Sequence, residues 1–187
     1  MALKKVGEGV SSWNNKIPFP KDRYACTCIE ESLEKSQGNN NPMVKRVWEI
    51  VNPEYAVGHD GRNLAVSGLK ITTYRVIKVH LEDEDGWDKE KSEKAFNQFV
   101  DELLAGGFSE VEVDDENPPL FFKNKTMDCI VSAKKDVARK LPTQAELKEG
   151  KRVGAEIKDA SGNPIETYQL IIDTILGPSS TKVDVAY

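Results

Sequence analysis

Two runs near the start of the chain have the residue pattern of β-strands. Arg23–Ile29 and Met43–Val51 are filled with the β-branched, aromatic and cysteine side chains that suit a pleated surface. The connection between them, Lys35–Asn41, is polar and rich in residues that tolerate positive φ, and Pro42 then favours an extended restart. The pattern predicts a long antiparallel hairpin with a polar tip.

A third run, Asn63–Val79, is the longest stretch with strand character, and Gly68 interrupts it. Glycine inside a strand usually marks a bulge or a sharp bend. After this glycine, Lys70, Thr72 and Tyr74 fall on one face, because strand side chains alternate with a period of two. The sequence therefore predicts a bent third strand.

The middle of the chain carries one amphipathic helix. Apolar residues recur at three- and four-residue steps over Lys89–Ala105, which places them on a single stripe. Asp88 is suited to cap the first turn, and Gly106-Gly107 is suited to end the last. We expect this stripe to pack on the sheet.

The second half of the chain predicts further strands. Met127–Ala133 is a strand, and Leu141–Gly150 holds one helical turn with a capping-box pattern that begins at Thr143. Lys151–Asp159 and Ile165–Leu176 are expected to pair as a second hairpin, with the strongly apolar Ile165–Leu176 in a central position.

The order of elements is therefore three strands, one helix and two or three more strands. This order predicts a mainly β (α+β) fold: a five-stranded Greek-key barrel with one amphipathic helix between strands 3 and 4, the oligonucleotide/oligosaccharide-binding (OB) arrangement. An α+β sandwich with a helix on an antiparallel sheet has the same order and stays open as an alternative. We expect an N-terminal arm at 1–20, the OB domain at 21–177 and a polar tail at 178–187.

Composition and charge restrict the class of protein. A chain of 187 residues with 30% charged residues suits one globular domain. Its net charge of −5 is unusual for a nucleic-acid binder, but acids and bases are clustered separately, so a basic groove on an acidic body is compatible with it. We expect no membrane span and no secretory signal, and three cysteines favour a reducing, intracellular compartment.

Candidate binding residues lie on the second and third strands. Arg46 and Trp48 are two apart and so share a face, where a cation beside an exposed ring is suited to stack unpaired bases. The opposite orientation, with Trp48 in the core, remains open, and so does a core position for Tyr74. The expected DNA-binding residues combine these two strands with a later basic segment: Lys45, Arg46, Trp48, Lys70, Tyr74, Lys134, Lys135, Arg139 and Lys140.

Metal binding and catalysis are disfavoured. Cys26 and Cys28 are spaced poorly for a tetrahedral zinc site, even with Cys129 and the two histidines, His59 and His80, as further ligands. The chain contains no nucleophile elbow, P-loop, HExxH or GxGxxG motif. We expect no enzyme activity, no cofactor and no metal.

The first hairpin resembles a known family, the OB-fold single-stranded-DNA-binding proteins encoded by tailed bacteriophages. The similarity is carried by Arg23-Tyr24, by the charged Glu34–Ser36 that leads into the Gly/Asn loop, and by Asn41–Val51. The helix at mid-chain and a closing strand near the C-terminus match in outline. The family commonly ends in a strongly acidic tail with a terminal aromatic, whereas Ser179–Tyr187 has the aromatic but a single acid.

The resemblance implies a largely sequence-independent single-stranded-DNA-binding protein that protects unpaired strands in phage DNA replication or recombination. It implies phage replication or recombination proteins as partners, although the weakly acidic tail makes their recruitment through the tail an open question, and the host cytoplasm as the location. The alternative is a phage virion or assembly protein that uses a β-sandwich for protein–protein contacts. The sequence does not fix the oligomeric state.

Overall fold

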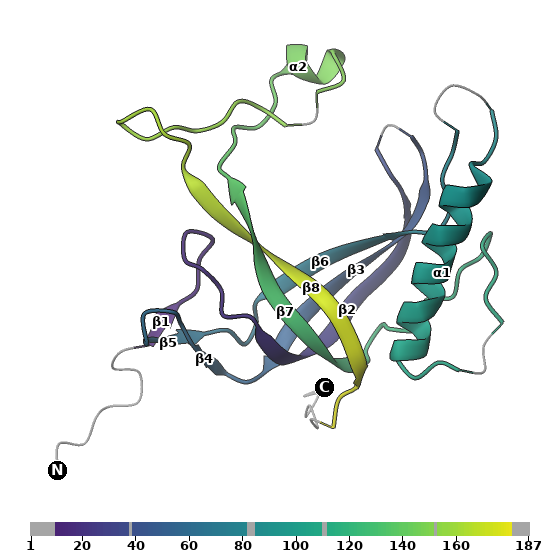
Figure 1. The fold of residues 1–187 in the computed structure, drawn as a ribbon, viewed down its shortest axis with the longest axis horizontal. Helices are drawn as coiled ribbons and strands as arrows, with labels where there is room; N and C mark the ends of the chain where they lie inside the picture. The colour runs from purple at the N-terminus through teal and green to yellow at the C-terminus, as the bar shows by residue number, and fades with distance from the viewer. Residues whose placement is uncertain (1–9, 38, 82–84, 110–111, 152, 181–187) are drawn as a thin grey trace.

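The computed structural model describes residues 10–37, 39–81, 85–109, 112–151 and 153–180. Within them the chain is mainly β, with one long helix against a five-stranded antiparallel sheet and a small three-stranded sheet beside it (Figure 1). The elements are β1 (Val10–Ser12), β2 (Asp22–Lys35), β3 (Pro42–Asn52), β4 (Tyr55–Val57), β5 (Asn63–Ala65), β6 (Lys70–Val76), α1 (Lys89–Ala105), β7 (Thr126–Val137), α2 (Gln144–Lys148) and β8 (Glu166–Pro178).

The large sheet has the order β6-β3-β2-β7-β8 and is not closed into a barrel. Among the described residues no ladder joins β6 to β8, so the expectation of a closed barrel is wrong. At the seam between them, the edge strands β6 and β8 approach each other without pairing. The pairing of β7 with β8 shifts register after Asp128 and again after Ile130, which increases local twist, and α1 contacts both edges at the seam.

The predicted first hairpin is confirmed. β2 and β3 pair in antiparallel register from Ala25 opposite Asn52 to Lys35 opposite Pro42. The tip between them includes Asn40, whose positive φ of 51° is one that asparagine tolerates. The predicted third strand, Asn63–Val79, is wrong as a single strand. The chain does turn at Gly68, which has φ of 84°, but β5 before it belongs to the small sheet and β6 after it to the large sheet.

The predicted helix is confirmed at the bounds expected from its periodicity. Asp88 caps α1 by accepting a hydrogen bond of 3.0 Å from the backbone N–H of Lys91. The apolar stripe buries Phe99 and Leu103 against the sheet. Gly106 ends the helix where no side chain would fit, because a Cβ there would lie 2.7 Å from the ring of Phe122.

The predicted second hairpin is wrong in its partner strand. β8 pairs along its length with β7, and the segment 151–165 forms only isolated bridges, such as Lys158 with Pro164. Pairing with β7 brings the apolar side chains of β8 to the core, whereas the polar segment 151–165 has few apolar side chains to bury. Together β7 and β8 form a long arm that carries α2 at its far end (Figure 1), and α2 has the predicted capping box at Thr143.

Part of the expected N-terminal arm packs onto the domain. β1 pairs with β5 in parallel, and Trp13 meets the buried ring of Phe19 edge-on at 5.7 Å between centroids. The arm expected at 1–20 is therefore integrated from residue 10 onward, while residues 1–9 and the tail residues 181–187 lie outside the described part.

The core lies between the inner face of the large sheet and α1. Its largest fully buried side chains are Trp48, Tyr24, Phe99, Phe122, Ile50, Ile71 and Ile77. No helix within the described residues combines the length and the apolar character needed to cross a membrane.

Candidate functional site

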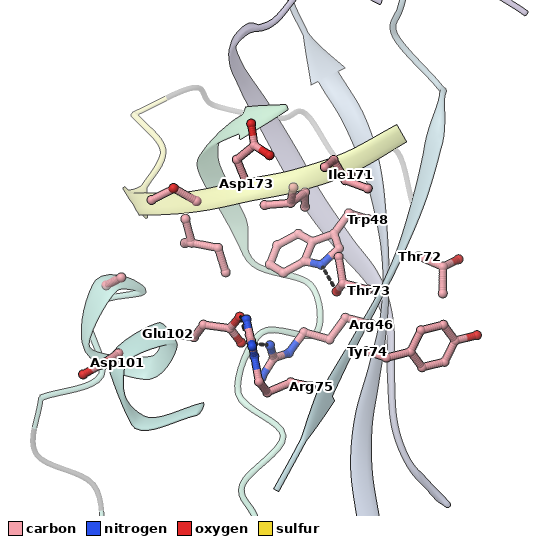
Figure 2. Close-up of a pocket in the computed structure, with 14 residues that line it drawn as sticks. Arg46, Trp48, Thr72, Thr73, Tyr74, Arg75, Asp101, Glu102, Ile171 and Asp173 are labelled. Atoms are coloured by element: carbon pink, nitrogen blue, oxygen red, sulfur yellow. Dashed lines mark hydrogen bonds and ion pairs between the residues drawn. The ribbon is translucent and has the colours of Figure 1, made fainter. Parts of the chain in front are cut away.

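Arg46 lies inside the protein, so its predicted role as an exposed DNA contact is wrong. Its guanidinium is 2% exposed and bridges two carboxylates: Nε donates to Glu31 at 2.8 Å, and Nη1 donates to Glu102 of α1 at 2.7 Å. The Glu102 carboxylate also accepts from Arg75 of β6, with Nε at 2.9 Å. The four charges form one network that ties α1 to the inner face of the sheet. Figure 2 shows three of its members, Arg46, Arg75 and Glu102, pointing toward one another.

Two further contacts complete this network. The second oxygen of Glu31 accepts from the backbone N–H groups of Phe122 and Lys123, at 2.9 and 3.1 Å. The Arg46 guanidinium lies 4.5 Å from the centroid of the Phe122 ring and 5.6 Å from that of Phe99, in cation–π geometry. The ion pair between Arg46 and Glu31 is fully desolvated, so removing either side chain would leave the other charge buried without a partner, which is costly.

Trp48 is also buried, at 1% exposure, and its predicted role as an exposed stacking platform is wrong. Its indole Nε1 donates to the hydroxyl of Thr73 on β6 at 3.1 Å, and its ring meets Phe122 edge-on. The reason is the alternation of β3. Val44 and Ile50 belong to the same inward face as Arg46 and Trp48, so apolar side chains take that face into the core.

The other predicted residues of β3 and β6 lie on the outer face of the sheet. Lys45 stands directly opposite Tyr74 in the β3–β6 ladder, and Tyr74 is 55% exposed. Lys70 is exposed on the same face, opposite Glu49. The structure therefore brings together Lys45, Lys70 and Tyr74 and separates them from Arg46 and Trp48.

Lys134 points to the same side of the sheet but lies at its other end, on the arm. Lys45 is opposite Ser32 of β2, whereas Val131 of β7 is opposite Asp22 at the other end of β2, and Lys134 is further along β7. Thr27 of β2, on the outward side, is opposite Thr126 of β7, and Lys134 shares the face of Thr126 because β7 alternates without a break. Lys134 is exposed and has no ion-pair partner among the described residues. We call the surface of Lys45, Lys70 and Tyr74 the outer face.

The remaining predicted residues are on the arm beyond the outer face. Lys135 points to the opposite side of β7 and pairs with Glu166 at 2.5 Å, and Arg139 pairs with Glu156 at 3.0 Å. Lys140 is exposed and has no ion-pair partner in the described part of the chain. Of the arm residues, Lys134 and Lys140 therefore retain an uncompensated charge.

Carboxylates reduce the positive charge of the outer face. Lys45 lies 3.2 Å from Glu34 and 3.7 Å from Glu30. Its hydrogen bond with Glu34 and the charges of both acids raise the pKa of Lys45, so it stays protonated. Its charge is shared with these two acids, which leaves less of it available to a phosphate.

The cysteines show no sign of reactivity. Cys26, Cys28 and Cys129 are buried, and burial raises the pKa of Cys28 to about 12. A hydrogen bond with Cys26, together with burial, also raises the pKa of Cys129. The described residues hold no group of three or more His, Cys, Asp or Glu side chains placed to bind a metal.

A cavity of about 420 Å³ lies at the open seam between β6, β8 and α1 (Figure 2). Arg46 and Trp48 line it from the interior, Asp101 and Glu102 line it from α1, and Ile171 lines it from β8. Sequence reasoning missed this cavity and its acidic residues. The sequence signal that points to Glu31 and Glu102 is Arg46. A charged residue at an inward position of a strand needs an opposite charge in order to be buried.

The chain has no detectable relative in any of three comparisons: no family model, no curated protein and no solved structure matches it.

Proposed function

We propose that the protein binds single-stranded DNA on the outer face, as an OB-type module with an open seam. The strand order supports this: numbering the five long strands along the chain gives 3-2-1-4-5 across the sheet, with the helix between the third and fourth. An OB-fold has five strands in a partly open Greek-key barrel and binds oligonucleotides on the face of strands 2 and 3. Those strands are β3 and β6.

The exposed ring of Tyr74 carries the proposal. It stands on the third strand with Lys45 beside it on the second and Lys70 further along the same face. A ring that is 55% exposed offers a π-face to an unpaired base, and such stacking contributes about 1–3 kcal/mol per base without sequence preference. This is the role first assigned to Trp48, now on the opposite face of the sheet.

The charges predict modest affinity with a defined salt dependence. Three lysines among the expected contacts have no carboxylate partner in the described residues: Lys70, Lys134 and Lys140. With three phosphate contacts on single strands, the logarithm of the binding constant falls with the logarithm of salt concentration with a slope of about −2. Binding should then weaken roughly 20-fold between about 50 and 200 mM salt.

A titration of a fluorescently labelled oligo-dT, followed by anisotropy at both salt concentrations, tests the proposal. We expect saturable binding, preference for the single strand over a duplex of equal length, and the salt dependence above. Tyr74→Ala should weaken binding about ten-fold, whereas Thr72→Ala, a matched change on the same strand face, should have little effect. No binding at low salt would end the proposal.

Phage replication or recombination is the context that we propose for this binding, with the resemblance of the first hairpin as its support. A second candidate is a protein-contact role in virion assembly, and the arm favours it. Leu141 is 91% exposed and Val153 is 61% exposed near the end of the arm, more apolar surface than a DNA contact requires. Light scattering together with the oligo-dT titration separates the two: assembly predicts defined oligomers that do not bind oligo-dT.

A further inference from the structure

Two carboxylates flank the cation that stands beside the proposed stacking residue. Lys45 of β3 is opposite Tyr74 of β6 on one side and opposite Ser32 of β2 on the other. Glu30 and Glu34 lie two residues to either side of Ser32, in a part of β2 that keeps its register with β3, so they share its face of the sheet. Diagonal neighbours of this kind are close enough for long side chains to meet.

The ammonium group of Lys45 contacts both acids. Its Nζ lies 3.2 Å from Oε1 of Glu34 and 3.7 Å from Oε1 of Glu30. The side chain of Lys45 is 24% exposed, whereas the side chains of Glu34 and Glu30 are 38% and 56% exposed. A phosphate that approaches this part of the outer face therefore meets two accessible carboxylates around a less accessible ammonium group.

We propose that Glu30 and Glu34 limit the affinity of the outer face by withholding Lys45 from the phosphates of a bound strand. Together the three side chains carry a net negative charge, and a phosphate has to displace carboxylates before it can pair with the ammonium group. This inference rests on the proposed single-strand function and adds to it two residues that set the strength of binding.

The neighbouring charges on the sheet are consistent with this role. Glu49 lies on the same side of β3 as Lys45 and is opposite Lys70. Carboxylates in these places weaken the attraction for any polyanion, so a ligand has to gain much of its affinity from stacking on Tyr74. The paired bases of a duplex do not offer a free face for stacking, so the acids favour unpaired strands.

The test is a double-mutant cycle on Lys45 and Glu34, with the titration of labelled oligo-dT as the assay. Glu34→Gln removes the closer carboxylate and nearly keeps the size of the side chain. We expect it to tighten binding roughly five- to ten-fold at about 50 mM salt and to steepen the salt slope from about −2 to about −3, because the released lysine adds one phosphate contact. In the Lys45→Met background the same change should tighten binding less than about two-fold, because there is no lysine to release.

Glu49→Gln is the matched control. It removes one negative charge from the same side of the sheet, and no ion pair joins Glu49 to Lys45 in the described part of the chain. Its effect should stay below about two-fold, because it relieves only screened repulsion. Exposed ion pairs contribute little to folding, so all of these variants should melt like the parent.

The outcomes are distinguishable. If neither the parent nor Glu34→Gln binds oligo-dT, the proposed function fails, and this inference fails with it. If the parent binds and Glu34→Gln has the same affinity and salt slope, the single-strand function stands and the inference is overturned. Equal tightening by Glu34→Gln with and without Lys45 would also overturn it, because general repulsion would then explain the effect.

Discussion

Replacing Arg46 with methionine separates a structural role from a DNA-contact role. Met has a similar length and no charge, so Arg46→Met leaves the Glu31 carboxylate, whose side chain is 0% exposed, without its cation. Removing one partner of a buried ion pair typically costs about 3–5 kcal/mol. Glu31 keeps two backbone N–H donors, which places the expected loss near the lower end, at about 3 kcal/mol.

Urea denaturation of both proteins measures this loss as a change in the free energy of unfolding. For a chain of 187 residues, a loss of about 3 kcal/mol corresponds to a fall in Tm of roughly 6–12 °C. Lys70→Met is the matched control, since it removes a lysine from the outer face. It should change stability by less than about 0.5 kcal/mol and weaken DNA binding.

The opposite result would refute the assignment. If Arg46→Met kept the unfolding free energy of the parent and lost affinity for oligo-dT, Arg46 would be a surface contact and the network with Glu31 and Glu102 would not hold the sheet to α1.

Three further predictions follow from individual residues. A hydrogen bond from the Lys91 backbone lowers the pKa of the Asp88 carboxyl, so the stabilisation of α1 by Asp88 is present above the unfolded pKa of about 3.9. This stabilisation is lost as pH falls through the lower, folded pKa. In acid, the stability of Asp88→Asn should therefore change less with pH than that of the parent, as thermal melts followed by circular dichroism would show. Gly106→Ala should destabilise the protein by about 1–3 kcal/mol in urea titrations, because its Cβ would lie 2.7 Å from the Phe122 ring; an unchanged midpoint would contradict this packing. Thiol reagents should label none of the cysteines in the native protein and all of them in urea, and rapid native labelling would show that their burial is wrong: Cys26, Cys28 and Cys129.

The helix and the first hairpin were predictable because their signals are local. The apolar stripe over Lys89–Ala105, its cap at Asp88 and the glycines after it specify α1 without reference to the rest of the chain. The same holds for β2 and β3 and the polar tip between them. The partner of β8 was not predictable in this way, because an apolar strand pairs with any long neighbour that is available, and the segment between β7 and β8 offered a nearer candidate, Lys151–Asp159.

The sequence contains the signal for the orientation of β3, but we predicted the face of Arg46 and Trp48 to be exposed, and it is the buried face. Val44 and Ile50 have the same parity as Arg46 and Trp48, which indicates a core face, whereas Lys45 and Glu49 occupy the other face. An arginine on the core face requires a buried acid. The acids that meet it, Glu31 and Glu102, are 15 and 56 residues away in sequence, a distance over which periodicity gives no information.

The most direct test of the central claim is residue-specific mapping of the DNA contact by amide chemical-shift perturbation with a short oligo-dT. We expect shifts concentrated on the outer face, at Lys45, Lys70, Thr72 and Tyr74, with further shifts at Lys134 on the arm. Saturating oligo-dT that leaves these amides unmoved, or that shifts only the end of the arm around Leu141, would contradict it.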